Sequence, residues 1–419
     1  MQRVTGTYRE SVAGEETVRA FIPHPLSPTR PPLRIEGELA RLHADALAAL
    51  GRLDVAGTMV PSADWFLYGF SRKEAVVSSQ IEGTEATLQD VITYEAIRQA
   101  EDPADVEEVC NYVEALDYAR CQISDPHGLP ISIRLLCKAH ARLMAGARGG
   151  QRQPGEVRTS QNWVGGTQPG NASFVPPPPD AVPQALSELE EWIHADDPLP
   201  PLVRAGLAHV QFETIHPFLD GNGRIGRLLV TLLVQDWGLL SSPLLYLSVA
   251  FKHRQEAYYE RLDAVRAEGD WEGWTEFFLE CVREAATDGV STARRLFRLL
   301  NEGRRTVLDH PDSTMTTVKL FDRLPDHPVV TVSRAIELTD TTKPTAAKAI
   351  DALCEAGILE EITGRQRGRA YAYRAYLDTL AEESPAQSQG GDAPAEAPDG
   401  PTRRFGDALR RLAHGAGED

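Results

Sequence analysis

The sequence has few cysteines, no long apolar run and no excess of basic charge. Its five cysteines are odd in number and form no Cys-x-x-Cys pair, which argues against a disulfide framework or a zinc cluster. The N-terminus is polar and no run approaches the roughly 20 apolar residues of a membrane span, so we expect a soluble cytoplasmic protein without a membrane partner. A balance of 61 acidic against 43 basic side chains argues against tight, sequence-independent binding to nucleic-acid phosphates.

The chain has 419 residues, of which 42% are hydrophobic and 25% charged, enough apolar surface for two or three folded domains. Residues 1–34 are rich in proline and arginine and are predicted to form an extended arm. Helical spacing of apolar residues then predicts a mainly α fold, with Thr84 opening one of the helices. The predicted helices cover 35–53, 62–83, 84–101, 103–121, 131–144, 180–194, 201–215, 223–237, 248–267 and 270–304.

The composition of the sequence changes at residue 149, and the spacing of its predicted elements changes at residue 316. Residues 149–179 are rich in Gly, Pro, Asn, Thr and Gln, which predicts a loop with one hairpin. From residue 316 the order helix, strand, helix, helix, hairpin is typical of a winged helix-turn-helix. We place this small domain at 313–378, after a region of helices, and a disordered acidic and proline-rich tail at 379–419.

The most informative segment is 216–227, HPFLDGNGRIGR, which lies between two apolar helical patterns. Pro217 ends the incoming helix, so His216 falls at a helix end. Gly221 and Gly223 allow a tight turn whose inward N–H groups meet the start of the next helix. Such a turn is a concave site for an anion.

Three charged residues complete this segment. Arg224 and Arg227 lie one turn apart at the start of the second helix and suit phosphate oxygens. Asp220 supplies a hard carboxylate where a divalent ion could bridge phosphates. Together with His216 the segment predicts a nucleotide-phosphate cradle with a histidine within reach.

The segment resembles, without a mismatch, the HPFx[D/E]GNGRxxR signature of the Fic family (Fic/DOC fold). The resemblance implies that His216 is the general base for a Ser, Thr or Tyr hydroxyl and that Asp220 holds Mg²⁺ or Mn²⁺. It implies transfer of AMP from ATP to a protein, with release of pyrophosphate. The implied nucleotide contacts are Asp220, Gly221, Asn222, Gly223, Arg224, Ile225, Gly226 and Arg227.

An upstream segment, SSQIEG, resembles the [ST]xxxE[GN] inhibitory motif of Fic proteins through Ser78, Glu82 and Gly83. The resemblance implies that Glu82 reaches Arg227 and blocks the place of the γ-phosphate. A close carboxylate–guanidinium pair gains about 4 kcal/mol at an effective dielectric near 20, before desolvation is subtracted. Glu82 is therefore expected to reduce the activity without abolishing it.

Two further segments resemble parts of the same family. The loop 154–179 resembles the Fic flap, which adds a target segment as a strand, and its Val164, Gly165, Gly166 and Thr167 match the portion near the nucleotide. Tyr258 and Tyr259 resemble a tyrosine pair at the adenine pocket, although a core role for one of them stays open. Residues 266–268 depart from the family pattern, which leaves the preference for adenine less certain than phosphate binding.

We therefore expect a Fic helical core at 106–305 with a β-hairpin flap, preceded by an arm and inhibitory helices at 1–105 and followed by the winged domain. The leading hypothesis is an autoinhibited protein adenylyltransferase that uses ATP and Mg²⁺ on a protein target or on itself. Removal of AMP at the same site is one alternative. A nucleotide-sensing transcriptional regulator is the other, with DNA binding by the winged domain or a homodimer left open.

Overall fold

The computed structural model describes residues 3–13, 16–28, 30–58, 63–100, 102–146 and 152–382, with the side chains of 63–66 excepted. Most of the predicted tail, residues 383–419, therefore lies outside the described residues. The buried apolar side chains of the described part form one continuous core that extends from the first helix to the last. Every helix in the described part is too short or too polar to cross a membrane.

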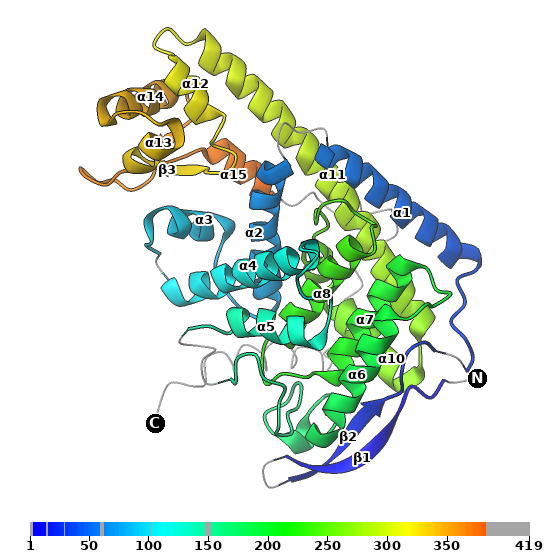
Figure 1. Cartoon of the computed structure of the whole chain (residues 1–419). Helices are drawn as coiled ribbons and strands as arrows, with labels where there is room; N and C mark the ends of the chain where they lie inside the picture. The colour runs from blue at the N-terminus through cyan, green and yellow to red at the C-terminus, as the bar shows by residue number, and fades with distance from the viewer. Residues whose placement is uncertain are drawn as a thin grey trace, which may run out of the picture.

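The N-terminal half of the fold has five helices, of which α2, α3 and α5 pack against α4 (Figure 1). Pro103 occupies the first turn of α4 and the Asp102 side chain caps it, as the sequence predicts. The start of α3 differs from the prediction: Thr87 forms a capping box with Asp90, so the helix begins at Leu88 and not at Thr84. The five helices are α1 (Gly37–Thr58), α2 (Ala63–Ile81), α3 (Leu88–Ile97), α4 (Pro103–Ser124) and α5 (Ile133–Leu143).

The central helices pack around α7 and α8, which are almost entirely buried. The long helix α11 runs beside α1 (Figure 1), where Gly289 leaves room for Leu53. The single helix predicted over 248–267 is two helices, because the backbone leaves helical geometry at Arg254. The central helices are α6 (Val182–His194), α7 (Pro201–Ile215), α8 (Asn222–Asp236), α9 (Leu247–His253), α10 (Gln255–Glu268) and α11 (Trp271–Asp309).

The predicted N-terminal arm is an antiparallel hairpin of β1 (Gly6–Ala13) and β2 (Glu16–Pro23). Its β2 strand lies against the loop 154–179, where the Phe21 amide donates to the Val175 carbonyl over 2.9 Å. The hairpin predicted inside that loop is reduced to a single antiparallel bridge between Val164 and Phe174. Two short 3-10 turns, Pro169–Asn171 and Pro179–Ala181, complete the loop.

The C-terminal part has the predicted order of elements, and its three strands form one antiparallel sheet in the order β3-β5-β4. Its assignment as a winged helix-turn-helix stays a prediction. The elements are α12 (Met315–Phe321), β3 (Val329–Thr331), α13 (Val332–Thr339), α14 (Lys343–Glu355), β4 (Glu360–Glu361), β5 (Ala370–Ala372) and α15 (Arg374–Ala381).

The last helix of the C-terminal part, α15, packs against α2 (Figure 1). Leu380 is fully buried and lies so close to Gly69 that a Cβ there would be 2.7 Å from the leucine Cδ1. The Lys73 ammonium donates to the Glu382 carbonyl over 3.0 Å. The folded part therefore extends past residue 379, where the tail is predicted to begin, and it contacts the helix that precedes Glu82.

Candidate active site

The turn between α7 and α8 places His216 at the end of one helix and Asn222 at the start of the next. His216 caps α7 in the left-handed conformation, with φ 50° and ψ 61°, and Gly221 precedes α8 with φ 74°. The Asn222 side chain accepts from the Phe218 amide and donates to the Phe218 carbonyl, both over 2.8 Å. The Asn222 side chain thus closes the turn, and the first N–H groups of α8 are left for an anion.

Arg227 and the upstream Glu82 form an ion pair over this helix start. Arg227 Nη2 donates to Glu82 Oε1 over 2.7 Å, while its Nε donates to Ser78 Oγ over 2.8 Å. The guanidinium is buried, with 1% of its side chain exposed, against 28% for Glu82. Burial raises the pKa of Glu82, but the charges of Arg227 and Arg224 outweigh burial and hold that pKa below its usual range.

Gly223 explains how the Glu82 carboxylate fits above α8. A Cβ at residue 223 would lie 2.3 Å from Glu82 Oε1 and 3.0 Å from Arg227 Nη1. The carboxylate therefore occupies the space directly over the Gly223 Cα, where the cradle is predicted to receive a phosphate. Gly83 follows with φ 105°, a conformation that glycine adopts readily, so the chain turns away directly after Glu82.

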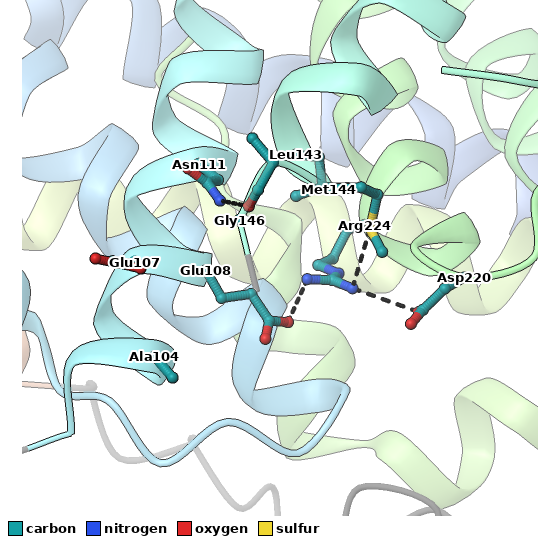
Figure 2. Close-up of a pocket in the computed structure, with 10 residues that line it drawn as sticks. Ala104, Glu107, Glu108, Asn111, Leu143, Met144, Gly146, Asp220 and Arg224 are labelled. Carbon is teal, nitrogen blue, oxygen red and sulfur yellow. Dashed lines mark hydrogen bonds and ion pairs between the residues drawn. The ribbon is translucent and has the colours of Figure 1, made fainter. Parts of the chain in front are cut away.

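Arg224 lies between two carboxylates and a thioether (Figure 2). Its Nη1 pairs closely with Glu108 of α4, its Nη2 is 3.5 Å from Asp220 Oδ1, and Met144 Sδ is 4.0 Å from Nη2. Only 4% of the Arg224 side chain is exposed, whereas 45% of Asp220 is exposed. Asp220 Oδ1 also accepts from the Gly221 amide over 2.6 Å, so the carboxylate is oriented by the turn while it remains accessible from solvent.

His216 is half-buried, and its surroundings favour the neutral ring. Burial is the main cause that lowers its pKa to about 4; the Arg158 guanidinium acts in the same direction, and a hydrogen bond with the Glu213 backbone opposes them. At neutral pH the ring is therefore uncharged. One ring nitrogen can then accept a proton.

Two residues that sequence reasoning missed hold the turn in place. Arg158 is buried and donates to four backbone carbonyls, among them His216 over 2.8 Å and Pro177 over 2.6 Å. His140 of α5 stacks on Phe218 with ring centroids 3.8 Å apart. Arg158 lies in the loop that resembles the flap, but the resemblance assigns neither residue a role, and their contacts join segments up to 80 positions apart, so no local signal pointed to them.

The ring nitrogens of His140 fix its tautomer. Nδ1 accepts from the Gly155 amide over 2.9 Å, so the proton lies on Nε2, which donates to the Asp220 carbonyl over 3.1 Å. Burial lowers the pKa of His140 to about 4, which keeps the ring neutral. The side chain therefore connects α5, the flap and the turn without adding charge next to Arg224.

The flap is attached to the turn just before its predicted segment 164–167. Asn162 Nδ2 donates to the Phe218 carbonyl over 3.0 Å, which attaches the flap to the turn. Val164 pairs with Phe174, and Gly165 and Gly166 follow with φ 68° and 73°. The Thr167 amide donates to Asn171 Oδ1 over 2.9 Å. The segment 164–167 is therefore a tight turn braced from within the flap.

The remaining predicted contacts divide between core and surface. Tyr258 is buried, and its hydroxyl lies 2.9 Å from His209 Nε2, which is a core position. Tyr259 is half-buried and remains the candidate for a contact with the base. Ile225 is fully buried, and Gly226 lies against Glu213 and His209, where a Cβ would be 2.3 Å from Glu213 Oε1.

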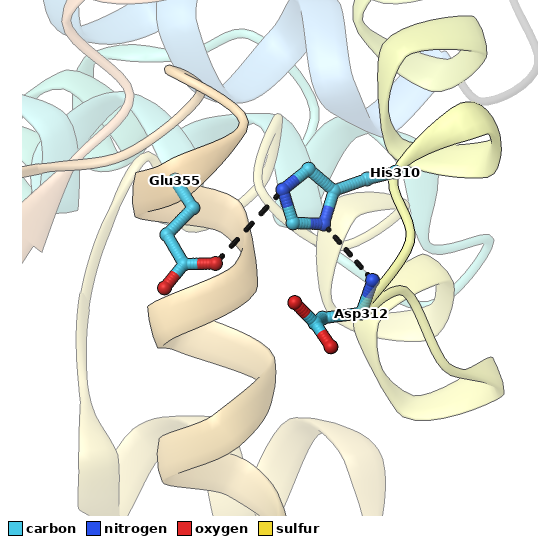
Figure 3. A group of neighbouring side chains, drawn as sticks. All are labelled: His310, Asp312 and Glu355. Atoms are coloured by element: carbon cyan, nitrogen blue, oxygen red, sulfur yellow. Dashed lines mark hydrogen bonds and ion pairs between the residues drawn. The ribbon is translucent and has the colours of Figure 1, made fainter.

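A second cluster of potential ligands lies in the C-terminal part, where α11 ends beside α14 (Figure 3). The side chains of His310, Asp312 and Glu355 offer ligand atoms within 4.8 Å of one another. His310 Nδ1 accepts from the Asp312 amide over 3.3 Å, and Nε2 faces Glu355 at 4.0 Å. Because Nδ1 is an acceptor here, the neutral ring carries its proton on Nε2, which faces Glu355 beyond hydrogen-bond distance, an arrangement that suits a local turn contact better than a metal.

Two family models match the chain. Residues 40–120 match the Fic/DOC family N-terminal model, and residues 130–234 match the Fic/DOC family model. The first match contains Glu82 and Glu108, and the second contains the whole turn from His216 to Arg227.

Curated relatives match parts of the chain. The protein adenylyltransferase Fic of Drosophila grimshawi is 28% identical over 247 residues, which is 57% of this chain and 46% of the relative. The protein adenylyltransferase fic-1 of Caenorhabditis briggsae is 31% identical over 133 residues, 31% of this chain and 24% of the relative. The chain thus spans less than half the length of these relatives.

Solved structures confirm the fold. A Fic family protein from Desulfovibrio desulfuricans is 25% identical with a TM-score of 0.52, and the match covers 82% of this chain and 98% of that one. A Fic domain containing signaling protein from Bacteroides thetaiotaomicron is 19% identical with a TM-score of 0.50, over 60% of this chain and 97% of that one. The second likeness concerns the fold alone.

Proposed function

We propose that this chain, which belongs to the Fic/DOC family, is an autoinhibited protein adenylyltransferase. It would transfer AMP from ATP to a Ser, Thr or Tyr hydroxyl of a protein target or of the chain itself. The observation that carries the proposal is the grouping of His216, Asp220, Arg224 and Arg227 around the N-terminus of α8, with Glu82 over the same helix start.

His216 would act as the general base. A hydroxyl near its free pKa is a weak nucleophile, so it needs a base that is uncharged at neutral pH. Burial keeps the pKa of His216 near 4, which meets this requirement. The hydroxyl oxygen forms a bond to the α-phosphorus, the bond from that phosphorus to the bridging oxygen breaks, His216 takes the hydroxyl proton, and pyrophosphate leaves.

The start of α8 would bind the triphosphate. The free N–H groups of the first turn and the guanidinium of Arg227 favour negative charge at this position. Asp220 would hold Mg²⁺ or Mn²⁺, because its carboxylate is 45% exposed and only loosely paired with Arg224. The ion would neutralise charge on the phosphates when bound.

Glu82 would be the inhibitory residue. Its carboxylate occupies the space over Gly223 and pairs with Arg227, and a phosphate cannot enter the same space. Release of the inhibition then requires Glu82 to leave Arg227 while the negative γ-phosphate takes its place. The same carboxylate could orient a water for removal of AMP, and an assay can separate the two reactions.

The test is intact-mass measurement of wild type, Glu82→Gly and His216→Ala after incubation with ATP or GTP and metal. We expect an adenylyl increment with ATP that is larger in Glu82→Gly and absent in His216→Ala. Loss of AMP from pre-modified protein, with metal and without ATP, would assign the reverse reaction instead. Retention of the increment in His216→Ala would contradict the proposed base.

Basic side chains in the C-terminal part call for a test of the alternative function, a transcriptional regulator that binds DNA. Arg365, Arg367 and Arg369 are exposed beside the strands β4 and β5, and Lys343 and Lys348 are exposed on α14. A salt-dependent shift of duplex DNA by the full chain, together with an inactive Glu82→Gly variant, would favour the transcriptional regulator over the enzyme.

A further inference from the structure

We propose that Glu108 is a positioning residue for Arg224, which keeps this guanidinium from pairing fully with Asp220. The inference rests on the proposed function, because it concerns how the charged side chains of the proposed triphosphate site pair with one another. Glu108 lies on α4, outside the segment 216–227 that carries the signature, and no motif in the sequence points to it.

The contacts of Arg224 carry the argument (Figure 2). Glu108 pairs closely with Nη1, whereas the contact of Nη2 with Asp220 is longer, at 3.5 Å. The Nε of Arg224 is buried and has no hydrogen-bond partner among the described residues. The direction of the guanidinium is therefore determined mainly by the two carboxylates, one on each side.

The two carboxylates differ in their exposure to solvent and in the element that carries them. Glu108 is 19% exposed and lies on the rigid helix α4, while Asp220 is 45% exposed and lies in the turn before α8. Removing one partner of a buried ion pair leaves an uncompensated charge, which is strongly unfavourable. Without the charge of Glu108, Arg224 would turn toward Asp220, and the Asp220 oxygens would be occupied by the arginine.

The pairing of Arg224 should affect how the proposed site binds metal and nucleotide. With Glu108 present, Asp220 keeps lone pairs for a divalent ion, and Arg224 stays at the helix start where phosphates are expected. With Glu108 neutralised, metal and nucleotide must compete with the Arg224–Asp220 pair. We expect weaker binding of the metal–nucleotide complex and little change in the step that His216 assists.

The chain offers a matched control in the next residue. Glu107 has the same charge and lies on the same helix, but it is exposed and its carboxylate accepts from the Tyr94 hydroxyl over 3.1 Å. Both residues line the same pocket (Figure 2). Glu107→Gln therefore makes the same change in net charge as Glu108→Gln without altering the partners of Arg224.

The experiment compares Glu108→Gln with Glu107→Gln in the Glu82→Gly background. We expect Glu108→Gln to raise the KM for ATP and the half-saturating Mg²⁺ concentration about tenfold, the usual size of an effect on a residue that orients a metal-binding group. The kcat at saturation should change less than twofold, and Glu107→Gln should resemble the parent. Equal KM and Mg²⁺ dependence in the two variants would overturn the inference, and so would a faster Glu108→Gln, which would make Glu108 a second inhibitor.

Binding without turnover separates this inference from the proposed function. Calorimetric titration of Mg·ATP into the same variants carrying His216→Ala should show the tenfold loss of affinity for Glu108→Gln, even if the parent transfers no AMP. In an Asp220→Asn background the loss should disappear, because Arg224 no longer has a second charged partner. A loss of the same size in that background would refute the mechanism. If Glu108→Gln fails to fold, Glu108→Asp must show the same direction of change.

Discussion

Arg227 and Glu82 are 145 positions apart in the sequence and 2.7 Å apart in the structure, joined by a hydrogen bond from Nη2 to Oε1. The pair couples the end of α2 to the second turn of α8. Because the Arg227 guanidinium is buried and the Glu82 carboxylate is partly exposed, Glu82 is the partner that can leave.

Replacing Glu82 should increase AMP transfer. We expect Glu82→Gly to raise the rate of self-modification about 5- to 150-fold, the usual range for coupling between two sites. Glu82→Gln keeps the size of the side chain and removes its charge, so it should give an intermediate increase. Rates can be measured with labelled ATP, and equal rates in all three proteins would contradict an inhibitory role.

A side chain at residue 223 should conflict mainly with Glu82. The Cβ of Gly223→Ala would lie 2.3 Å from Glu82 Oε1, and such overpacking costs about 1–3 kcal/mol. We expect a lower Tm for Gly223→Ala and recovery of most of this loss in the double variant Glu82→Gly, Gly223→Ala. Calorimetry on the four proteins measures the coupling, and additive effects would show that the two residues do not compete for space.

The pH dependence of transfer should reflect the low pKa of His216. Burial lowers this pKa to about 4, so the neutral base is present above pH 4 and is lost as the pH falls through that value. In the Glu82→Gly variant, the rate should therefore show no inflection from His216 between pH 6 and 8. Circular dichroism at each pH controls for unfolding, and an inflection near pH 6.5 would indicate a solvated histidine.

Arg158 should be essential for the stability of the turn. Its guanidinium donates to four carbonyls, and lysine cannot reproduce this planar arrangement. Each carbonyl left without a donor costs about 1–3 kcal/mol, so Arg158→Lys should lower the free energy of unfolding by at least that amount. Arg152→Lys, an exposed change before the same segment, is the control in urea unfolding. A similar midpoint for both variants would be evidence against this role.

Much of the fold could be predicted because its signals are local. Pro103 and Pro201 begin helices at the predicted positions, since proline fits the first turn and lacks only a donor that is unused there. The error at Thr84 is also local: Thr87 lies three residues before Asp90 and can form a reciprocal capping box, which outweighs a threonine alone.

The candidate site was predictable only in part. The contact between Glu82 and Arg227 was expected from the resemblance of two motifs, and it is present. The roles of Glu108, Arg158 and His140 could not be predicted, because the resemblance assigns them none and each reaches the turn through packing between segments that are distant in the sequence. The position of Tyr258 in the core likewise depends on its contact with His209 of another helix.

The contact of Lys73 with the Glu382 carbonyl, 309 positions later, has a consequence for the order of synthesis. A ribosome makes a chain from the N-terminus at about 5–20 residues per second. The turn at 216–227 is therefore complete well before α15 exists. A growing chain that has not reached residue 382 already contains the segment 216–227, while the helix that leads to Glu82 still lacks its last packing partner.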